Sequence, residues 1–299
     1  MCSCDNNTPL LPDTAIAAAN VGQSARVYYQ LTDGSLATQI YQRDDYDQTW
    51  QWKRSEKSPA TAKLFTPLAA IAEHDGDSLK WHVFFLNENN VLSDVHESGG
   101  TWSCGSLCNR NIQVPHFSKL ACSWVASKTL RLYYQGDKGQ IHSVTYKDKC
   151  WQSDCKPMST DASLLGTSIA ACQSAEIDQM AATCGIQEHS SDSVSATGIE
   201  DASSHSSISA VGTNEYRFIF FTTNQSKLMG QHVTKSGNTT SYIGKITPKS
   251  CIASLRNKVN DDDPDVIRVY CQRGEDNDMS KISEYRYTQD EGWVYRGNI

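Results

Sequence analysis

Short runs of alternating apolar and polar residues fill most of this chain of 299 residues. Typical runs are "GSLATQIYQ" from Gly34, "GQIHSVTY" from Gly139 and "KISEYRY" from Lys281. Alternation with a period of two is typical of strands that bury one face. Because no segment of helical length shows a competing period, the pattern predicts an all-β protein.

Two short sequence marks recur six times and define a repeat. The first mark is an aliphatic residue followed by small residues, as in "AIAAA" and "SIAAC". Its aliphatic positions are spaced by 52, 52, 49, 39 and 44 residues: Ile16, Leu68, Leu120, Ile169, Ile208 and Ile252. The second mark, typified by "RVYYQ", follows after a turn and is headed by Arg26, His82, Arg131, Gln179, Phe218 and Arg268.

Each repeat continues with an alternating run and a final element that carries tryptophan in four repeats, at Trp50, Trp102, Trp151 and Trp293. Six units of four short strands predict one domain over residues 1–299, a six-bladed β-propeller. Small residues suit the crowded innermost strand of a blade, and aromatic residues suit the roomier second strand. The expected blades span approximately residues 14–66, 67–117, 118–165, 166–206, 207–249 and 250–299. An irregular β-sandwich is the alternative fold.

Composition narrows the function classes. The formal net charge of -7 argues against nucleic acid as a partner, because that binding depends on Lys and Arg neutralising phosphates. No apolar run approaches the ~18 residues that a membrane-spanning helix needs. The polar start "MCSCDNNTPLLPDT" has no basic n-region, and we expect Met1 to replace a removed signal peptide.

Eleven cysteines and three N-x-S/T sequons favour a protein of the secretory pathway. The expected glycosylation sites are Asn6, Asn224 and Asn238. Three close cysteine pairs could form short disulfide loops: Cys2/Cys4, Cys104/Cys108 and Cys150/Cys155. The odd count leaves one thiol unpaired or shared between chains, so a homodimer is possible. No zinc array occurs, and neither a metal nor another cofactor is expected.

The repeated pattern of small residues, "RVYYQ", an alternating strand and "GW" resembles the fungal fucose-binding lectins with six-bladed propellers, over nearly the whole chain. The resemblance implies sugar sites between blades. Each would use an arginine at the head of the second strand, a glutamate or glutamine on the third strand and an aromatic ring from a neighbouring blade. Arginine and carboxylate form charge-assisted hydrogen bonds with hydroxyl groups, and an aromatic face covers the apolar side of the sugar.

The six repeats keep these polar residues unevenly. Arg268 and Glu284 form a complete pair in the last repeat, and the first repeat has Arg26 with Gln39. In the second repeat His82 and Asp94 replace arginine and glutamate. The remaining repeats lack one or both partners: Arg131 with Val144, Gln179 with no clear partner, and Phe218 with Gln231. The loss of equivalent sites indicates that the scaffold has taken on another task.

A second resemblance suits that departure. The repeat layout and the opening "TAIAAANV…ARVYYQ" resemble the fungal hetero-Diels–Alderases of tropolone–sesquiterpenoid biosynthesis. This resemblance implies an enzyme of secondary metabolism that dehydrates a tropolone alcohol to a quinone methide and joins it to a humulene-type sesquiterpene. The alternatives are a lectin for fucosylated glycans and a non-catalytic interaction propeller.

Candidate residues follow from that chemistry, which needs a proton carrier, an oxyanion donor and an apolar wall. The expected catalytic residues are Arg268, Glu284, Arg131, His82 and Asp94. The expected substrate-binding residues are Trp50, Trp102, Trp293, Tyr28, Tyr133, Tyr134, Arg26 and Gln39. Each has a structural alternative, since strand-two aromatics are more often core and an arginine can pair with a neighbouring blade's carboxylate. The acidic run at Asp261, Asp262, Asp263 and Asp265 suits a solvated loop better than a calcium site.

Overall fold

The structure is a computed structural model that describes residues 8–299 with several gaps. The gaps are residues 45, 47–48, 76–77, 127, 154–156, 159–161, 174–177, 183–186, 191–193, 197–198, 200, 214, 258–263 and 275–280. At residues 75 and 78, and from 173 to 198, the description covers the backbone alone. Among the described residues, no helix has the length and apolarity required to cross a membrane.

Six antiparallel sheets of four consecutive strands form the described part of the chain. The innermost strands are β1 (Ala17–Val21), β5 (Ala69–Asp75), β9 (Leu120–Ala126), β13 (Ile169–Gln173), β17 (Ile208–Gly212) and β21 (Ala253–Asn257). The second strands are β2 (Ser24–Gln30), β6 (Ser78–Leu86), β10 (Thr129–Gln135), β14 (Asp178–Ala182), β18 (Tyr216–Thr222) and β22 (Val266–Cys271). The third strands are β3 (Leu36–Arg43), β7 (Leu92–Ser98), β11 (Ile141–Lys147), β15 (Gln187–Ser190), β19 (Lys227–Thr234) and β23 (Ser283–Thr288). The outer strands are β4 (Trp50–Arg54), β8 (Thr101–Cys104), β12 (Cys150–Ser153), β16 (Val194–Ala196), β20 (Gly237–Lys245) and β24 (Gly292–Asn298).

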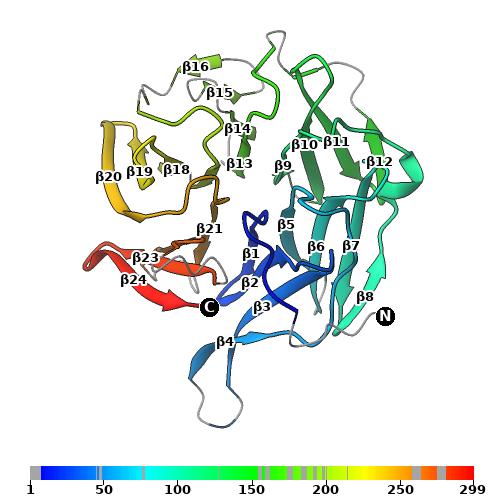
Figure 1. The fold of residues 1–299 in the computed structure, drawn as a ribbon, viewed down its shortest axis with the longest axis horizontal. Coiled ribbons are helices and arrows are strands. Elements are labelled where there is room, and N and C mark those ends of the chain that lie inside the picture. The colour runs from blue at the N-terminus through cyan, green and yellow to red at the C-terminus, as the bar shows by residue number, and fades with distance from the viewer. Residues whose placement is uncertain are drawn as a thin grey trace.

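The sheets stand around a central axis as six blades, numbered 1 to 6 in chain order (Figure 1). The interface between two successive blades is named by their numbers, so blades 6 and 1 meet at the 6–1 interface. Inner strands of successive blades contact each other around the whole ring, and β21 contacts β1. The prediction of an all-β, six-bladed propeller with four-stranded blades is confirmed.

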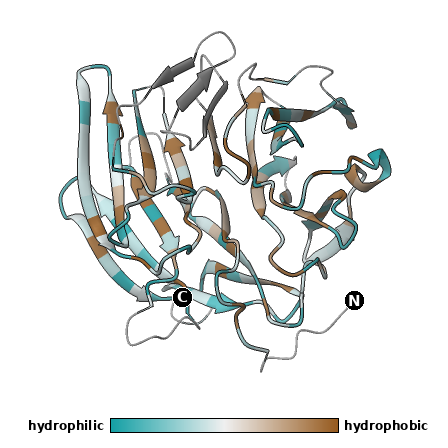
Figure 2. Ribbon diagram, turned by 45° about the horizontal axis from the view of Figure 1, so that its top comes forward, coloured by the Kyte–Doolittle hydropathy of each residue, from teal (hydrophilic) through white to brown (hydrophobic). Residues whose placement is uncertain are grey.

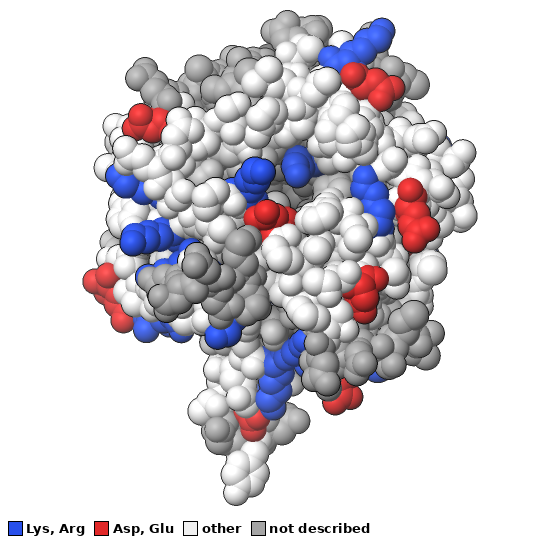
Figure 3. Space-filling view, in the orientation of Figure 1, with Lys and Arg blue, Asp and Glu red and all other residues white. Residues whose placement is uncertain are grey.

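The predicted small residues line an axial channel. A cavity of about 320 Å³ is bounded by the inner strands, and its wall includes Ala17, Ala69, Ala121, Ala170 and Ala253. Side chains as small as alanine let the strands approach the axis closely. Figure 3 shows the hollow at the centre of this face, with basic and acidic side chains near its mouth. Hydrophobic and hydrophilic segments alternate along many of the strands (Figure 2).

In five of the six blades a repeated hydrogen bond ties the entry of the blade to the end of its second strand. The hydroxyl groups of Thr14, Ser118 and Ser250 each accept the backbone N–H of a strand-two glutamine at 2.8 Å. The amide Nε2 of one of these, Gln30, donates to the carbonyl of Lys63 in the loop to the next blade, at 2.8 Å. The glutamine of the "YYQ" mark is therefore structural, because it joins neighbouring blades.

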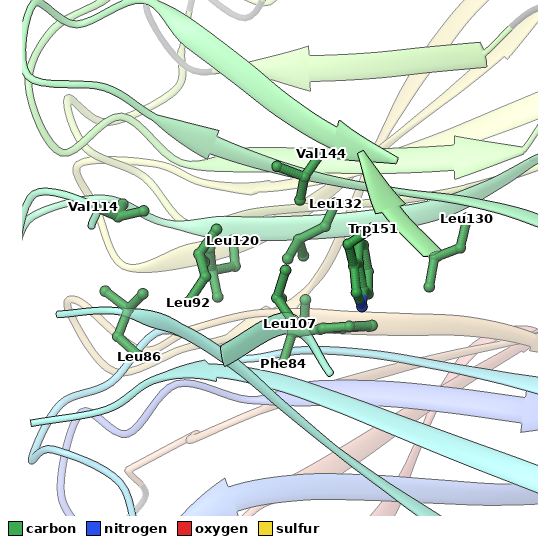
Figure 4. Close-up of a cluster of buried hydrophobic side chains, with 11 residues drawn as sticks. Phe84, Leu86, Leu92, Leu107, Val114, Leu120, Leu130, Leu132, Val144 and Trp151 are labelled. Atoms are coloured by element: carbon green, nitrogen blue, oxygen red, sulfur yellow. The ribbon is translucent and has the colours of Figure 1, made fainter. Parts of the chain in front are cut away.

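Aromatic pairs fill the spaces between blades. At the 2–3 interface, Phe84 meets Trp151 edge-to-face with ring centroids 5.8 Å apart (Figure 4). The same pairing recurs at 5.6–6.2 Å between Tyr28 and Trp102, between Phe220 and Trp293, and between Tyr270 and Trp52. Edge-to-face geometry adds to the benefit of burying such rings. The second-strand aromatics thus act mainly as core.

The first and last blades are each complete, so side chains close the ring without a shared strand. Asn20 Nδ2 donates to the carbonyl of Arg256 at 2.8 Å, and Asn257 Nδ2 donates to the carbonyl of Gly22 at 2.9 Å. In Figure 1 the blue first blade lies beside the red last blade.

The predicted disulfide loops do not form where the structure describes their cysteines. Cys104, Cys108 and Cys150 are free thiols. The remaining members of the pairs, Cys2, Cys4 and Cys155, lie outside the described residues. Sequence spacing alone does not fix the directions of two Cβ atoms, and a disulfide depends on those directions.

Candidate functional site

Cross-strand register shows which residues of different blades are equivalent. Glu284 lies opposite Tyr270, and in blade 1 Thr38 lies opposite Tyr28. The corresponding residues of blades 2, 3 and 5 are Asp94, Ser143 and Gly230. In blade 4, Glu188 holds this position by its backbone register.

The expected partners Gln39, Val144 and Gln231 are one residue out of this register. Gln39, for example, lies opposite Val27 and therefore on the other face of its sheet. The outer strand of blade 1 needs a separate correction. Trp52 pairs with Tyr41 as Trp293 pairs with Tyr287, whereas Trp50 pairs with Arg43. Trp52 is thus the blade-1 equivalent of Trp293, and Trp50 is not.

The 6–1 interface holds a buried ion pair inside blade 6. Arg268 Nη1 lies 2.5 Å from Glu284 Oε1, with Arg268 8% and Glu284 5% exposed. Tyr270 Oη donates to the same carboxylate oxygen at 3.3 Å. From blade 1, Trp52 Nε1 donates to the other oxygen at 3.4 Å. The Glu284 carboxylate therefore accepts hydrogen bonds from two neighbouring blades.

An aromatic wall from blade 1 faces this ion pair. The Arg268 guanidinium carbon lies 4.3 Å from the centre of the Tyr41 ring, a cation–π contact. Tyr41 also lies against Trp50 and Trp52, with ring centroids 5.3 and 5.1 Å apart. The expected residue Trp50 therefore borders the site through Tyr41, whereas Tyr41 and Trp52 were missed by sequence reasoning.

The protonation states at this interface suit hydrogen bonding to a neutral ligand. Burial lowers the pKa of Arg268, but the adjacent Glu284 carboxylate more than offsets this and the pKa is raised overall. Burial raises the pKa of Tyr270, and the charge of Glu284 raises it further. Arg268 thus stays charged and Tyr270 stays a neutral hydroxyl. Arg268 Nε is buried and has no hydrogen-bond partner among the described residues.

At the 1–2 interface the arginine is committed to a different partner. Arg26 Nη1 lies 2.7 Å from Glu97 Oε2 of blade 2, and its guanidinium lies 4.3 Å from the centre of the Trp81 ring. Glu97 occupies in blade 2 the position of Tyr41 in blade 1, since Glu97 pairs with Trp102 and Tyr41 pairs with Trp52. Burial raises the pKa of Tyr28 in the same space. Arg26 therefore has the structural role of joining two blades.

The other expected site residues are distributed around the ring. His82 and Asp94 line a pocket at the 2–3 interface. At the 5–6 interface Phe218 replaces the arginine and packs against Tyr287 and Trp293 with centroids 5.4 and 6.1 Å away. In blade 3, Tyr133 is fully buried, Arg131 lies opposite Thr145, and Tyr134 stacks on His142. No single described pocket brings the five expected catalytic residues together.

Metal binding finds no support in the described part of the chain. No group of three or more His, Cys, Asp or Glu side chains is placed there to hold an ion. Asp265 forms an ion pair with Arg256 at 2.7 Å. The neighbouring Asp261, Asp262 and Asp263 lie outside the described residues.

Comparison with known proteins identifies the family. The family model described as "Fungal fucose-specific lectin" matches residues 10–297, and the chain belongs to this family. A fucose-specific lectin of Aleuria aurantia is 32% identical over 140 residues, which are 44% of this chain and 44% of that protein. One from Aspergillus oryzae is 29% identical over 143 residues, 46% of this chain and 44% of that protein. These matched segments thus span less than half of each lectin.

Solved structures agree in fold. The six-bladed Aleuria aurantia lectin superposes with a TM-score of 0.82 at 24% identity, covering 98% of this chain and 97% of that one. AofleA of Arthrobotrys oligospora gives a TM-score of 0.79 at 18% identity, covering 97% and 88%. At these identities the likeness shows the fold alone.

The expectation of a hetero-Diels–Alderase is wrong. The family match and the lectin relatives favour the lectin alternative and point away from an enzyme. The expected reaction also needed its donors and proton carriers around two bound substrates. The structure instead separates Arg268, His82 and Arg131 among three blades. In the sequence alone, the missing arginine partners indicate that the scaffold has a new function. In blade 1, however, Arg26 pairs with Glu97 of blade 2 instead of with a carboxylate of its own blade.

Proposed function

We propose that this protein is a lectin that binds fucose-bearing glycans at the 6–1 interface. The observation that carries the proposal is the buried pair of Arg268 and Glu284 beside the rings of Tyr41 and Trp52. Membership of the fucose-specific lectin family supports the same ligand class.

The chemistry of this interface suits a sugar. Arg268 offers charged N–H donors, and Glu284 offers carboxylate oxygens, so adjacent hydroxyl groups could bind both. An aromatic face beside them shields the apolar side of a pyranose ring. The ion pair is preorganised, because Tyr270 and Trp52 already hold the carboxylate in place.

Low valency is part of the proposal. Among the interfaces whose side chains are described, the 6–1 interface combines arginine, its own blade's glutamate and a neighbouring aromatic pair. The 1–2 interface lacks the blade-1 carboxylate, and the 5–6 interface lacks the arginine. We therefore expect one fucose-type site per chain at these interfaces and little avidity from a single propeller.

Calorimetric titration with methyl α-L-fucoside tests the proposal. We expect saturable binding by the wild-type chain and at least a roughly hundredfold loss of affinity in Arg268→Ala, which removes a charged donor. Arg296→Ala is the matched control, because this arginine of the same blade forms an exposed pair with Glu291 at 2.6 Å. A folded wild-type protein that binds no fucoside, or an Arg268→Ala protein that binds normally, would overturn the proposal.

Secretion and glycosylation also remain proposals. The sequon residues Asn224 and Asn238 are exposed on blade 5, at a turn and on β20, whereas Asn6 lies outside the described residues. Mass spectrometry of the protein secreted by a fungal host should find N-glycan at Asn224 or Asn238. Retention of the unmodified chain inside the cell would contradict this proposal.

A further inference from the structure

The 2–3 interface contains a pocket that the proposed fucose site does not use. Its volume is about 300 Å³. It opens between β6 and β7 of blade 2 and the β11–β12 hairpin of blade 3. Its lining includes charged, imidazole and aromatic side chains: Lys80, His82, Asp94, His96, Tyr146 and Trp151.

Shorter side chains create the space. His82 and Asp94 hold the positions that Arg268 and Glu284 hold in blade 6. The shorter residues of blade 2 lie against an aromatic pair, Tyr146 and Trp151, whose rings are 5.1 Å apart. Behind the pocket, Phe84 packs edge-to-face against Trp151 (Figure 4).

His82 is a buried polar side chain with unused hydrogen-bonding capacity. It is 7% exposed, and its Nδ1 has no hydrogen-bond partner among the described residues. Its Nε2 lies 3.5 Å from Glu73 Oε1, at the outer limit of contact. A buried polar group without a full set of partners costs free energy, and a ligand in the pocket would remove that cost.

Basic groups surround a single carboxylate in this lining. His82 and His96 are directly opposed across β6 and β7, with ring centroids 5.8 Å apart. Burial lowers the pKa of His96, and the positive fields of Lys80 and His82 lower it further. An anion bound beside His96 would oppose this lowering of its pKa and favour the protonated imidazole.

Asp94 does not fully neutralise this group. Burial raises the pKa of its carboxyl group. Its Oδ1 already accepts the backbone N–H of Leu107 at 2.9 Å. The carboxylate is therefore partly engaged with its own blade.

We propose that the 2–3 pocket binds an acidic monosaccharide, with the ligand carboxylate against Lys80 and His96 and the pyranose ring against Trp151 and Tyr146. Ring hydroxyl groups bond with the imidazole of His82. This site is independent of the fucose site at the 6–1 interface and differs from it in ligand charge.

The geometry predicts tighter binding as the pH falls. An anionic ligand favours the protonated imidazole of His96, so binding and proton uptake are coupled. The titratable and charged groups around it are Glu73 on β5, Lys80 and His82 on β6, Asp94 on β7 and Cys104 on β8; from blade 3, Tyr146 faces the pocket. Protonation of Asp94 at lower pH also removes a negative charge that would repel the ligand carboxylate, so it too strengthens binding as the pH falls.

Titration with methyl β-D-glucuronide and methyl β-D-glucoside at pH 5.5 and 7.5 tests this site. The two probes differ in one carboxylate. We expect the glucuronide to bind about tenfold more tightly at pH 5.5 than at 7.5, and the glucoside to bind weakly at both. Lys80→Ala and His96→Gln should each weaken the glucuronide about fivefold or more.

Asp94→Asn separates an acidic-sugar site from a neutral-sugar site. We expect the glucuronide to bind this variant as tightly as the wild type or more tightly, because a repelling charge is removed. A neutral sugar held by the carboxylate would instead lose its affinity. The amide introduced by this substitution retains a carbonyl oxygen for the Leu107 N–H, so the variant should fold.

Three results would overturn this inference: equal binding of glucoside and glucuronide, no tightening at pH 5.5, or loss of glucuronide binding in Asp94→Asn. Arg268→Ala should leave glucuronide binding unchanged and abolish fucoside binding. Wild-type protein that binds glucuronide in this way but no fucoside would refute the proposed function and leave this site standing.

Discussion

The 6–1 and 1–2 interfaces use the same kind of arginine in two ways. Arg268 has its carboxylate within its own blade and faces an aromatic pair from the next blade. Arg26 has Thr38 in place of that carboxylate and takes Glu97 from the next blade instead. At the 6–1 interface, aromatic rings of blade 1 therefore lie beside the ion pair of blade 6. At the 1–2 interface, the Glu97 side chain takes the place of such a ring and forms the ion pair with Arg26.

A second difference lies beneath the arginine. Trp81 precedes His82 on the second strand of blade 2, and its ring supports Arg26. The equivalent residue of blade 1 is Ala25, which precedes Arg26. The smaller residue leaves room for Arg268 to lie over Tyr41. The role of each arginine therefore depends on the carboxylate position of its own blade and on the side chains of the neighbouring blade.

The largest expected effect is on stability, from Glu97→Ala. This change would leave Arg26 buried without its carboxylate, which typically costs about 3–5 kcal/mol of the free energy of unfolding. Urea denaturation measures that loss, and the fucoside affinity of the folded fraction should be unchanged. Glu291→Ala, which removes the exposed pairs with Arg286 and Arg296, is the control and should have a much smaller effect. Equal losses for both variants would contradict a structural role of Arg26.

Transplanting the 6–1 residues into the 1–2 interface should create a second site. The triple variant Thr38→Glu, Trp81→Ala and Glu97→Tyr gives blade 1 its own carboxylate and moves the aromatic neighbour of Arg26 from position 81 to position 97, which corresponds to Tyr41. We expect the stoichiometry of fucoside binding to rise from one to two per chain, as measured by calorimetry. Circular dichroism must first show a folded protein, because the change removes a buried ring. A folded variant that still binds one fucoside would show that the comparison omits an essential residue.

The pH dependence at the 6–1 interface should be flat. The pKa of Arg268 is raised, so the guanidinium is charged at every pH below it, and the raised pKa of Tyr270 keeps that hydroxyl neutral over the same range. Fucoside affinity should therefore change by less than about twofold between pH 6 and 9. A titration series over this range is the measurement, and a steep fall within it would contradict these assignments.

The smallest effect is expected from Gln39→Ala. Gln39 lies on the other face of its sheet and donates to Tyr29 Oη at 3.4 Å, a long hydrogen bond. Its loss should change the free energy of unfolding by about 0.5 kcal/mol or less and leave fucoside affinity intact. If Gln39→Ala weakened fucoside binding as Arg268→Ala is expected to do, the register of blade 1 would have to be revised.

The fold was predictable because its signal is local and repeated. Each of the six repeats has a strand of small residues, an aromatic strand and an alternating strand. Such units can bury their apolar faces only by packing against each other, which predicts a propeller. Arg268 and Glu284 were also predictable, since one blade supplies both. The contributions of Tyr41, Trp52 and Glu97 were not, because they come from the next blade and chain order does not reveal which side chains meet.

The register error had a usable signal. Leu36, Leu92, Ile141, Leu228 and Ile282 are fully or almost fully buried, and each lies two residues before the carboxylate position of its blade. Counting from this aliphatic residue leads to Thr38 rather than Gln39. Alternation alone cannot distinguish neighbouring positions when both are polar.

The side-chain hydrogen bonds between the first and last blades have a consequence for the whole molecule. The proposed fucose site at the 6–1 interface lies between the first and last blades, where the side chains of Asn20 and Asn257 also form hydrogen bonds across the interface. A sugar bound there would hold the first and last blades together, since it would contact both. Opening of the propeller and release of the sugar then become one event, and ligand stabilises the closed ring by mass action.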